Sequence, residues 1–222
     1  MNVRDNLSKL RASLPDGVKL VAVSKFHSVA TIQEAYDAGQ RIFGENRVQE
    51  LIAKQPVLPG DIEWHFIGSL QTNKVKYIAP FISMIQSVDS LKLMQEINRQ
   101  AENCNRTIRV LLEVHIAEEE SKHGFTPGEC ITFFSDGISE KYKNIQVCGL
   151  MGMATFTDDL AQVGREFSTL QTLFGEIRMM QAIDKSTFTE LSMGMSDDYL
   201  TAIEAGSTMV RIGSALFGAR DY

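Results

Sequence analysis

The stretch VKLVAVSKF, residues 18–26, joins a short apolar run to a lysine at its far end. Leucine, valine and alanine fill positions 20–23 before Ser24, as in a strand that is buried inside a sheet. Lys25 follows directly, although an ammonium group is rarely buried without a partner. The pattern therefore predicts a buried strand that brings Lys25 to its carboxyl end, and it raises the question of what an amine does there.

Working outward from this stretch, short apolar runs alternate with amphipathic segments along the whole chain. Each run has the length of a strand and is rich in Val, Ile, Leu or Met. The eight runs are KLVAVSK, RIFGEN, EWHFIGS, SMIQSVDS, RVLLEVHI, QVCGLMGM, TELSMGM and MVRIGS. Between the runs, apolar residues recur at helical spacing, most clearly in DLAQVGREFSTLQTLFGEIRMM. A further predicted helix, VRDNLSKLRAS, precedes the first run.

Eight strand–helix units in 222 residues predict an α/β fold, a single (β/α)8 TIM barrel. We expect residues 1–222 to form one domain. A doubly wound open sheet is the structural alternative. The regular repeat and the absence of a GxGxxG turn after the first strand favour the barrel.

The composition excludes several classes of protein. The formal net charge is −6 and no block of lysine and arginine occurs, so we expect no nucleic-acid partner. No apolar segment approaches the length of a membrane span, and the N-terminus has no signal-peptide pattern. The three cysteines are widely spaced without a CxxC pair, which is typical of a reducing compartment and predicts no metal site. We expect a cytoplasmic protein without a membrane partner.

A TIM barrel builds its site from strand carboxyl ends and the loops that follow them. Here these positions form a polar ring, and phosphate commonly binds after strands seven and eight. Ser196 follows the seventh run, and Gly213 and Ser214 follow the eighth, so a hydroxyl and close backbone N–H groups are available for phosphate oxygens. Two simpler interpretations stay open: Ser196 as an ordinary helix cap, and Gly213 as a packing glycine. The full ring comprises Lys25, Glu45, Asn46, Gly68, Ser69, Ser87, Asp89, His115, Met153, Thr155, Met195, Ser196, Gly213 and Ser214.

Two cations lie at the ends of strands that a closed barrel makes neighbours, Lys25 on the first and Arg211 on the eighth. A partly desolvated lysine near another cation keeps more of its neutral amine, which can attack an aldehyde. A phosphorylated aldehyde would bridge the amine and the phosphate site, and pyridoxal 5′-phosphate (PLP) is such a molecule. The alternative for both cations is a long side chain that reaches solvent at the rim.

Longer motifs match a known family. They are FGENRVQE at 43–50, WHFIGSLQTNKVKYI at 64–78, GLMGM at 149–153 and LSMGMSDDYLTAIEAGSTMVRIGSALFG at 191–218. With these motifs the chain resembles the PLP-binding proteins of the YggS/PROSC family, the PLP homeostasis proteins, from about Val18 to Gly218. Arg47 departs from the tyrosine that many relatives have at this position.

The resemblance implies a barrel like the N-terminal domain of alanine racemase and of fold-type III decarboxylases. It implies that Lys25 holds PLP as a Schiff base and that Ser196, Gly213 and Ser214 hold the phosphate. Arg211 would lie near the pyridine nitrogen or the phosphate. Asn46 would line the pocket, and Lys122 would approach the ring hydroxyl.

The resemblance also implies a role in PLP homeostasis without established catalytic turnover, with PLP-dependent apoenzymes as recipients and a monomer as the expected state. A racemase needs a base on each face of the substrate, and because the sequence continues for only eight residues after Ser214, we expect no second domain that would supply one. A cation beside the pyridine nitrogen also weakens the ring as an electron sink. Two alternatives stay open: a PLP-dependent amino-acid racemase or decarboxylase, and a phosphosugar enzyme that uses Lys25 without PLP.

Other polar residues of the motifs have ordinary structural interpretations. His65 is predicted to be a hydrogen-bonded core histidine. Gln71, Asn73 and Lys74 either face the pocket or form a solvated helix start. The methionines Met151, Met153, Met193 and Met195 are predicted to fill the core.

Overall fold

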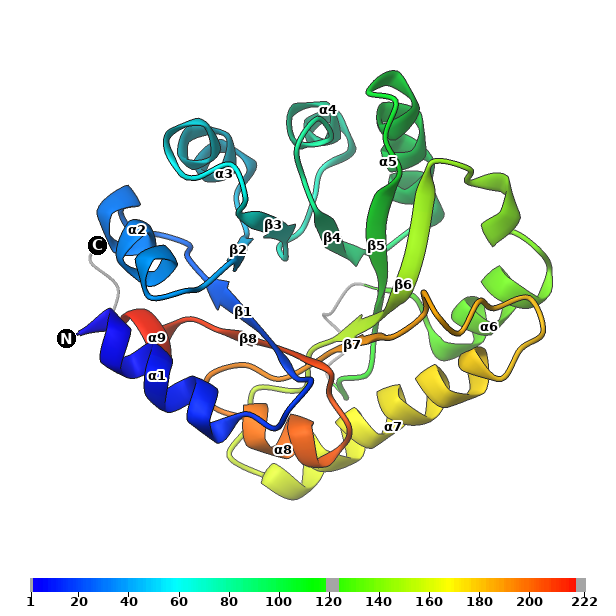
Figure 1. Ribbon diagram of the computed structural model, residues 1–222. Coiled ribbons are helices and arrows are strands. Elements are labelled where there is room, and N and C mark those ends of the chain that lie inside the picture. Colours follow the sequence, from blue (N-terminus) through cyan, green and yellow to red (C-terminus); the bar gives the residue numbers. More distant parts are fainter. Residues whose placement is uncertain (1, 119–123, 219–222) are drawn as a thin grey trace.

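The computed structural model describes residues 2–118 and 124–218, and its eight parallel strands close into a barrel (Figure 1). The strands are β1 (Lys19–Val23), β2 (Ile42–Glu45), β3 (Glu63–Phe66), β4 (Met84–Val88), β5 (Ile108–Val114), β6 (Ile145–Gly152), β7 (Glu190–Ser192) and β8 (Met209–Ile212). Each strand pairs with its sequence neighbours, and β8 pairs with β1. The predicted (β/α)8 barrel is confirmed, and the open sheet is excluded because β1 has a partner on both edges.

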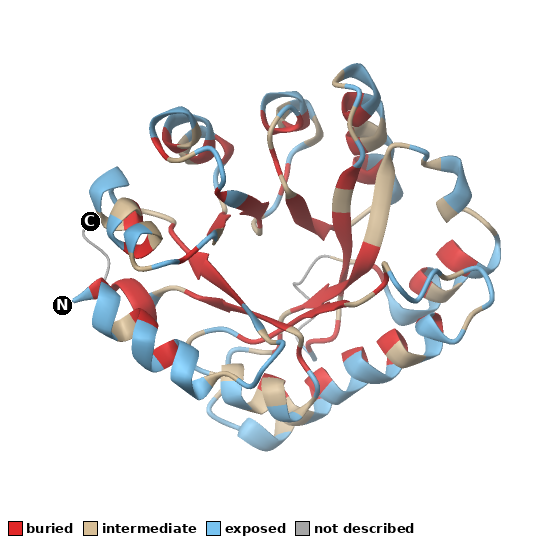
Figure 2. Ribbon diagram, viewed as in Figure 1, coloured by how far each residue is buried: buried red, intermediate tan, exposed pale blue. Residues whose placement is uncertain are grey.

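Helices surround the strands (Figure 1). They are α1 (Val3–Ser13), α2 (Val29–Asp37), α3 (Val48–Lys54), α4 (Val75–Ile78), α5 (Leu91–Asn103), α6 (Pro127–Ser135), α7 (Leu160–Arg178), α8 (Tyr199–Glu204) and α9 (Ser214–Phe217). Short 3-10 turns η1 (Gln55–Val57), η2 (Thr72–Lys74) and η3 (Ser139–Lys141) complete the connections. Figure 2 shows buried residues along the strands and on the inner faces of the helices. None of the helices in these two described stretches has the length and apolarity that a bilayer crossing requires.

The apolar core has two layers. The larger lies between the strands and the helices and includes Phe43, Leu112 and Phe167. The smaller fills the inside of the barrel with Val21, Met84, Leu111, Cys148, Met151 and Met209. Met193 joins the outer layer, as expected of a core methionine. The prediction is wrong for Met195, which is 37% exposed because it lies in the loop after β7.

The seam between β1 and β8 sets the position of the site. The register pairs Val21 with Arg211 and Ala22 with Ile212, so both strands end at the same level. A Cβ atom on Gly213 would lie 3.3 Å from the Cβ atom and the carbonyl oxygen of Val23. The loop after β8 therefore packs directly on the end of β1.

Candidate functional site

A pocket of about 490 Å³ opens at the carboxyl ends of the strands. Its lining includes six residues that the sequence analysis assigned to cofactor binding: Lys25, Asn46, Ser196, Arg211, Gly213 and Ser214. These residues come from the ends of β1, β2, β7 and β8 and from the loops that follow. The closure of β8 onto β1 brings the first and last of them together although they are far apart in the sequence.

Lys25 lies in a turn just beyond β1 and not in the strand itself. The strand ends at Val23, and Ser24 is still fully buried. Phe26, the next residue, has a φ of 66°. This left-handed conformation is uncommon for a residue with a side chain, and it is worth a functional question. Lys25 is half-buried and lines the pocket wall.

Arg211 is held inside the barrel, at the floor of the pocket. Only 4% of the residue is exposed, so the interpretation of a side chain that reaches solvent at the rim is wrong. One terminal nitrogen, Nη1, donates to the Ser192 hydroxyl at 2.6 Å and the other, Nη2, to the Gly152 carbonyl at 3.1 Å. Burial lowers the pKa of Arg211 to about 10, although the negative charges of Asp198 and Glu113 act to raise it. The guanidinium therefore stays charged at neutral pH.

A buried polar chain continues from Arg211 across the barrel interior. Ser192 donates its hydroxyl hydrogen to Gln86 at 2.7 Å, and the Gln86 amide nitrogen lies 2.8 Å from His65 Nδ1. Burial and the charges of Arg109 and Lys19 lower the pKa of His65 to about 3, so the imidazole is neutral at physiological pH. His65 is thus the predicted hydrogen-bonded core histidine, and it supports Arg211 only through two intermediate side chains.

Glu113 is a pocket residue that the sequence analysis missed. It lies on β5 and is 9% exposed. Burial, and to a smaller extent the charge of Asp89, raise its pKa to about 7, although the charge of Arg211 acts in the opposite direction. The signal in the sequence was a single acid inside the apolar run RVLLEVHI, which ordinary strand patterning does not explain.

Ser196 links the loops that follow β7 and β8. Its hydroxyl oxygen accepts the Gly213 N–H at 3.4 Å. The interpretation as an ordinary helix cap is wrong, because α8 begins after Asp198. The Asp198 carboxylate accepts the Met195 N–H at 2.5 Å and so is engaged within its own turn. Asp197 is exposed at the pocket wall.

Asn46 lies at the opposite wall, after β2. A Cβ atom on Gly68 would lie 2.6 Å from the Asn46 carbonyl oxygen, so only glycine permits this close approach. The Asn46 side-chain oxygen, Oδ1, is buried and has no hydrogen-bond partner among the described residues. A buried acceptor without a partner is costly, so this atom is ready to receive a donor from a bound molecule.

Several other residues that the sequence analysis considered for the site lie away from the pocket or outside the residues that the structure describes. Glu45 is fully buried and faces Ser24 and Lys54. Gln71 and Asn73 are exposed, and neither lines the pocket, in agreement with a solvated helix start. Lys122 lies outside the described residues. Within residues 2–118 and 124–218, no group of three or more His, Cys, Asp or Glu side chains is placed to hold a metal ion.

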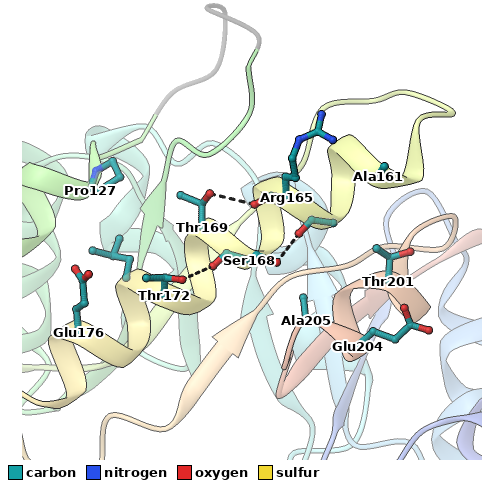
Figure 3. A pocket seen from close by; sticks show the side chains of 12 residues that line it. Pro127, Ala161, Arg165, Ser168, Thr169, Thr172, Glu176, Thr201, Glu204 and Ala205 are labelled. Carbon is teal, nitrogen blue, oxygen red and sulfur yellow. Dashed lines mark hydrogen bonds between the residues drawn. The ribbon is translucent and has the colours of Figure 1, made fainter.

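A second hollow, of about 780 Å³, lies on the outer wall between α7 and α8 (Figure 3). Its hydroxyl groups on α7 are engaged within that helix: Ser168 donates to the Gly164 carbonyl, Thr169 to the Arg165 carbonyl and Thr172 to the Ser168 carbonyl. The hollow is larger than the pocket at the barrel mouth. It nevertheless lacks the convergence of an amine, a buried cation and a buried acceptor without a partner, so the barrel mouth is the stronger candidate for the functional site.

A closed parallel barrel with a lysine just after β1 and polar loops after β7 and β8 belongs to the class of the alanine racemase N-terminal barrel. The family model described as "Alanine racemase, N-terminal domain" matches residues 1–221. Within this class, the chain belongs to the family of the pyridoxal phosphate homeostasis proteins. It is 38% identical to the member from Pasteurella multocida, over 100% of this chain and 99% of the relative. It is 41% identical to the human member, over 92% of this chain and 77% of the relative.

Solved structures agree with this assignment. PipY of Synechococcus elongatus, solved with PLP bound, has a TM-score of 0.85 at 36% identity, over 97% of this chain and all of PipY. PipY without PLP has a TM-score of 0.89. Alanine racemase of Clostridium difficile has a TM-score of 0.77 at 18% identity, and the match covers 57% of that chain, so this likeness concerns the fold alone. The family resemblance inferred from the motifs is confirmed.

Proposed function

We propose that this chain binds PLP at the mouth of the barrel, holds it covalently on Lys25, and serves PLP homeostasis. The observation that carries the proposal is the convergence of Lys25, Arg211, Ser196, Gly213 and Ser214 on one pocket at the seam of β1 and β8. The names of the relatives and the PLP bound in PipY support it.

The lining of the pocket fits the chemical groups of PLP. The Ser214 N–H and the Ser196 hydroxyl suit a phosphate group, which prefers backbone and hydroxyl donors. The Gly213 N–H, which donates to Ser196 at 3.4 Å, lies beside them and would turn to the phosphate on binding. The charge of Arg211, fixed by Ser192 and Gly152, favours an anion above the pocket floor. The orphaned Asn46 oxygen fits a hydroxyl donor of the ring.

The covalent step needs only Lys25 and the aldehyde. The neutral amine adds to the aldehyde carbon, the carbonyl oxygen leaves as water, and a carbon–nitrogen double bond remains. No oxidant or reductant is consumed. Bound PLP would supply a reversible aldehyde link, while this chain supplies the amine, the anion site and a wall that orients the ring.

The proposal assigns storage and delivery of PLP in place of amino-acid turnover. The printed names of the relatives describe homeostasis and state no reaction. A PLP-dependent racemase or decarboxylase is the rival, since the ionisable side chains of His27, Asp89 and Glu113 line the same pocket. Solvent-deuterium exchange into a panel of amino acids decides between them: exchange that Lys25→Ala abolishes would support the rival.

Borohydride reduction of PLP-loaded protein tests the covalent link. We expect a single pyridoxyl group on Lys25, located by peptide mass spectrometry, and loss of the imine absorbance in Lys25→Ala. A control with Lys19→Met, a lysine on the same strand that pairs with Glu190, should keep the adduct. An adduct on another lysine would contradict the proposal. Trapping of a phosphosugar on Lys25, with no reaction with PLP, would favour the phosphosugar enzyme.

The proposal extends to the setting of the protein. We infer a single PLP-binding barrel domain over residues 1–222, monomeric and cytoplasmic, with PLP-dependent apoenzymes as recipients and without nucleic-acid or membrane partners. The three cysteines are free thiols, as a reducing compartment favours. Light scattering should give a mass near 24.8 kDa with and without PLP.

A further inference from the structure

Both residues that flank Lys25 are held by polar contacts, buried at Ser24 and part-buried at Phe26. The Ser24 N–H donates to the Gly44 carbonyl at 3.0 Å, and the Ser24 hydroxyl donates to Glu45 Oε1 at 2.7 Å. On the other side, the Phe26 N–H donates to Glu50 Oε2 at 2.9 Å. The backbone on either side of Lys25 therefore depends on two carboxylates that lie outside the pocket lining.

A single ammonium group connects these contacts. Lys54 Nζ donates to Glu45 Oε1 at 2.8 Å, to Glu50 Oε2 at 3.0 Å and to the Ser24 carbonyl at 3.0 Å. An ammonium group has three donors, and all three are used. Glu45, Glu50 and Lys54 form what we call the buried triad, in which Glu45 is fully buried, Lys54 is 7% exposed and Glu50 is half-buried.

Stability alone is a poor explanation for the buried triad. Removing charges from water costs much of what their attraction returns, and well-packed apolar residues often stabilise a fold equally well. The triad instead supports a turn that is unfavourable by itself, since Phe26 is left-handed without being glycine. The Arg47 guanidinium, 4.7 Å from the centre of the Phe26 ring, packs on the same turn.

We propose that Glu45, Glu50 and Lys54 are positioning residues that hold the turn of residues 24–26 and thereby aim the Lys25 amine into the pocket. The inference rests on the proposed function, because it assumes that Lys25 captures the aldehyde. The triad contacts the two neighbours of Lys25 and leaves the loops after β7 and β8 untouched. Damage to the triad should therefore slow covalent capture and spare the phosphate site.

The test compares two ligands in one set of variants. PLP reports covalent capture, which is measured by borohydride reduction at timed intervals and mass spectrometry of the Lys25 peptide. Pyridoxine 5′-phosphate has an alcohol in place of the aldehyde, so its equilibrium binding reports the phosphate and ring contacts alone. We expect Glu50→Ala to slow capture about 10- to 100-fold, as misplacement of a reacting group does. Its affinity for pyridoxine 5′-phosphate should change less than about twofold, as for distant independent sites.

Matched variants separate positioning from general support. Glu50→Gln keeps an oxygen that can accept the Phe26 N–H and should restore most of the capture rate. Lys19→Met removes the ion pair at the other end of β1 and should leave the rate unchanged. Lys54→Met, which leaves two carboxylates without their cation, should slow capture as Glu50→Ala does. Hydrogen exchange at the Phe26 amide should become faster in Glu50→Ala than in wild type.

The outcomes that overturn the inference are distinct from failure of the proposed function. Wild-type capture rates in a folded Glu50→Ala protein would overturn it. Equal losses of PLP capture and pyridoxine 5′-phosphate binding would also overturn it, because the triad would then be a general structural support. Absence of the Lys25 adduct in wild type would instead remove the proposed function itself. If Lys54→Met does not fold, the two Glu50 variants decide.

Discussion

Glu113 makes the charge of the pocket sensitive to pH near neutrality. Its carboxyl shares the barrel mouth with Arg211, and Asp89 lies near enough to raise its pKa. A pKa of about 7 means that the pocket loses a negative charge as the pH falls through this value. An anionic ligand then meets less repulsion beside Arg211. The raised pKa of Glu113 also makes the stability of the fold depend on pH, with or without a ligand.

We expect Glu113→Gln to change how stability depends on pH. A carboxyl whose folded pKa is raised from 4.5 to about 7 stabilises the fold below pH 4.5 relative to high pH, and this contribution is lost as the pH rises through 7. Over that window the loss amounts to about 3 kcal/mol. Urea unfolding from pH 5 to 8 should therefore show wild type losing stability relative to Glu113→Gln. His65, with a lowered pKa, titrates in both proteins and cancels in the comparison. Parallel pH profiles would contradict the assignment.

Ser196 offers the clearest single-residue test of the proposed phosphate site. Its hydroxyl is polar, half-buried and in contact with the Gly213 N–H, and it lines the pocket. A hydrogen bond to a charged group contributes about 1.5 to 3 kcal/mol, so Ser196→Ala should weaken equilibrium PLP binding about 10- to 150-fold. Ser168→Ala, whose hydroxyl is engaged within α7, is the control and should bind PLP as wild type does. Equal affinity in both variants would remove Ser196 from the phosphate site.

At the scale of elements, the turn from β7 to α8 depends on Gly194. Its φ is 95°, and a Cβ atom there would lie 2.6 Å from the Ala202 Cβ atom. Gly194→Ala combines backbone strain with a clash, and it should lower the free energy of unfolding by about 1 to 3 kcal/mol. Gly175→Ala is the control, because Gly175 lies within α7 with open space around it and alanine should stabilise the helix by about 0.5 to 1 kcal/mol. Urea denaturation of both variants measures the difference, and a neutral Gly194→Ala would contradict the strain.

The elements themselves were predictable because their sequence periods are strong. The eight apolar runs each coincide with a strand, although β5 and β6 begin one residue before their runs, and the loops proposed to hold phosphate follow β7 and β8. The direction of a long side chain was not predictable. For Arg211 the sequence left two directions open, a place near the bound cofactor and a side chain that reaches solvent at the rim. The side chain is buried inside the barrel, where Ser192 and Gly152 accept its hydrogen bonds from other strands. Lys54 resembles a solvated residue at a helix end, yet it is buried because Glu45 and Ser24 meet it from β2 and the turn after β1. Such placements depend on tertiary contacts that no local pattern encodes.

At the scale of the whole molecule, the barrel closes where both ends of the described chain meet. The helix α1 lies beside α9, next to the seam of β1 and β8 (Figure 1). The side-chain amide of Asn6 donates to the Leu216 carbonyl at 3.0 Å. The helix α9 begins at Ser214, a residue of the pocket, so α1 supports the wall of the site from outside. If the barrel unfolds cooperatively, a substitution that destabilises α1 must also lower the stability of strands on the far side of the barrel.

Leu7→Ala tests this cooperativity. Leu7 lies on α1 and is 1% exposed, and truncation of a buried leucine typically costs about 2 to 5 kcal/mol. The single tryptophan, Trp64, lies on β3 away from α1 and is 2% exposed, so its fluorescence reports a distant part of the barrel. We expect one urea transition, with tryptophan fluorescence and far-ultraviolet circular dichroism shifting together to lower urea. Leu200→Ala, at a residue that is 55% exposed, should leave both midpoints in place. If Leu7→Ala shifted only the circular dichroism, α1 would unfold separately, and the closed barrel would then be stable without the helix that covers its seam.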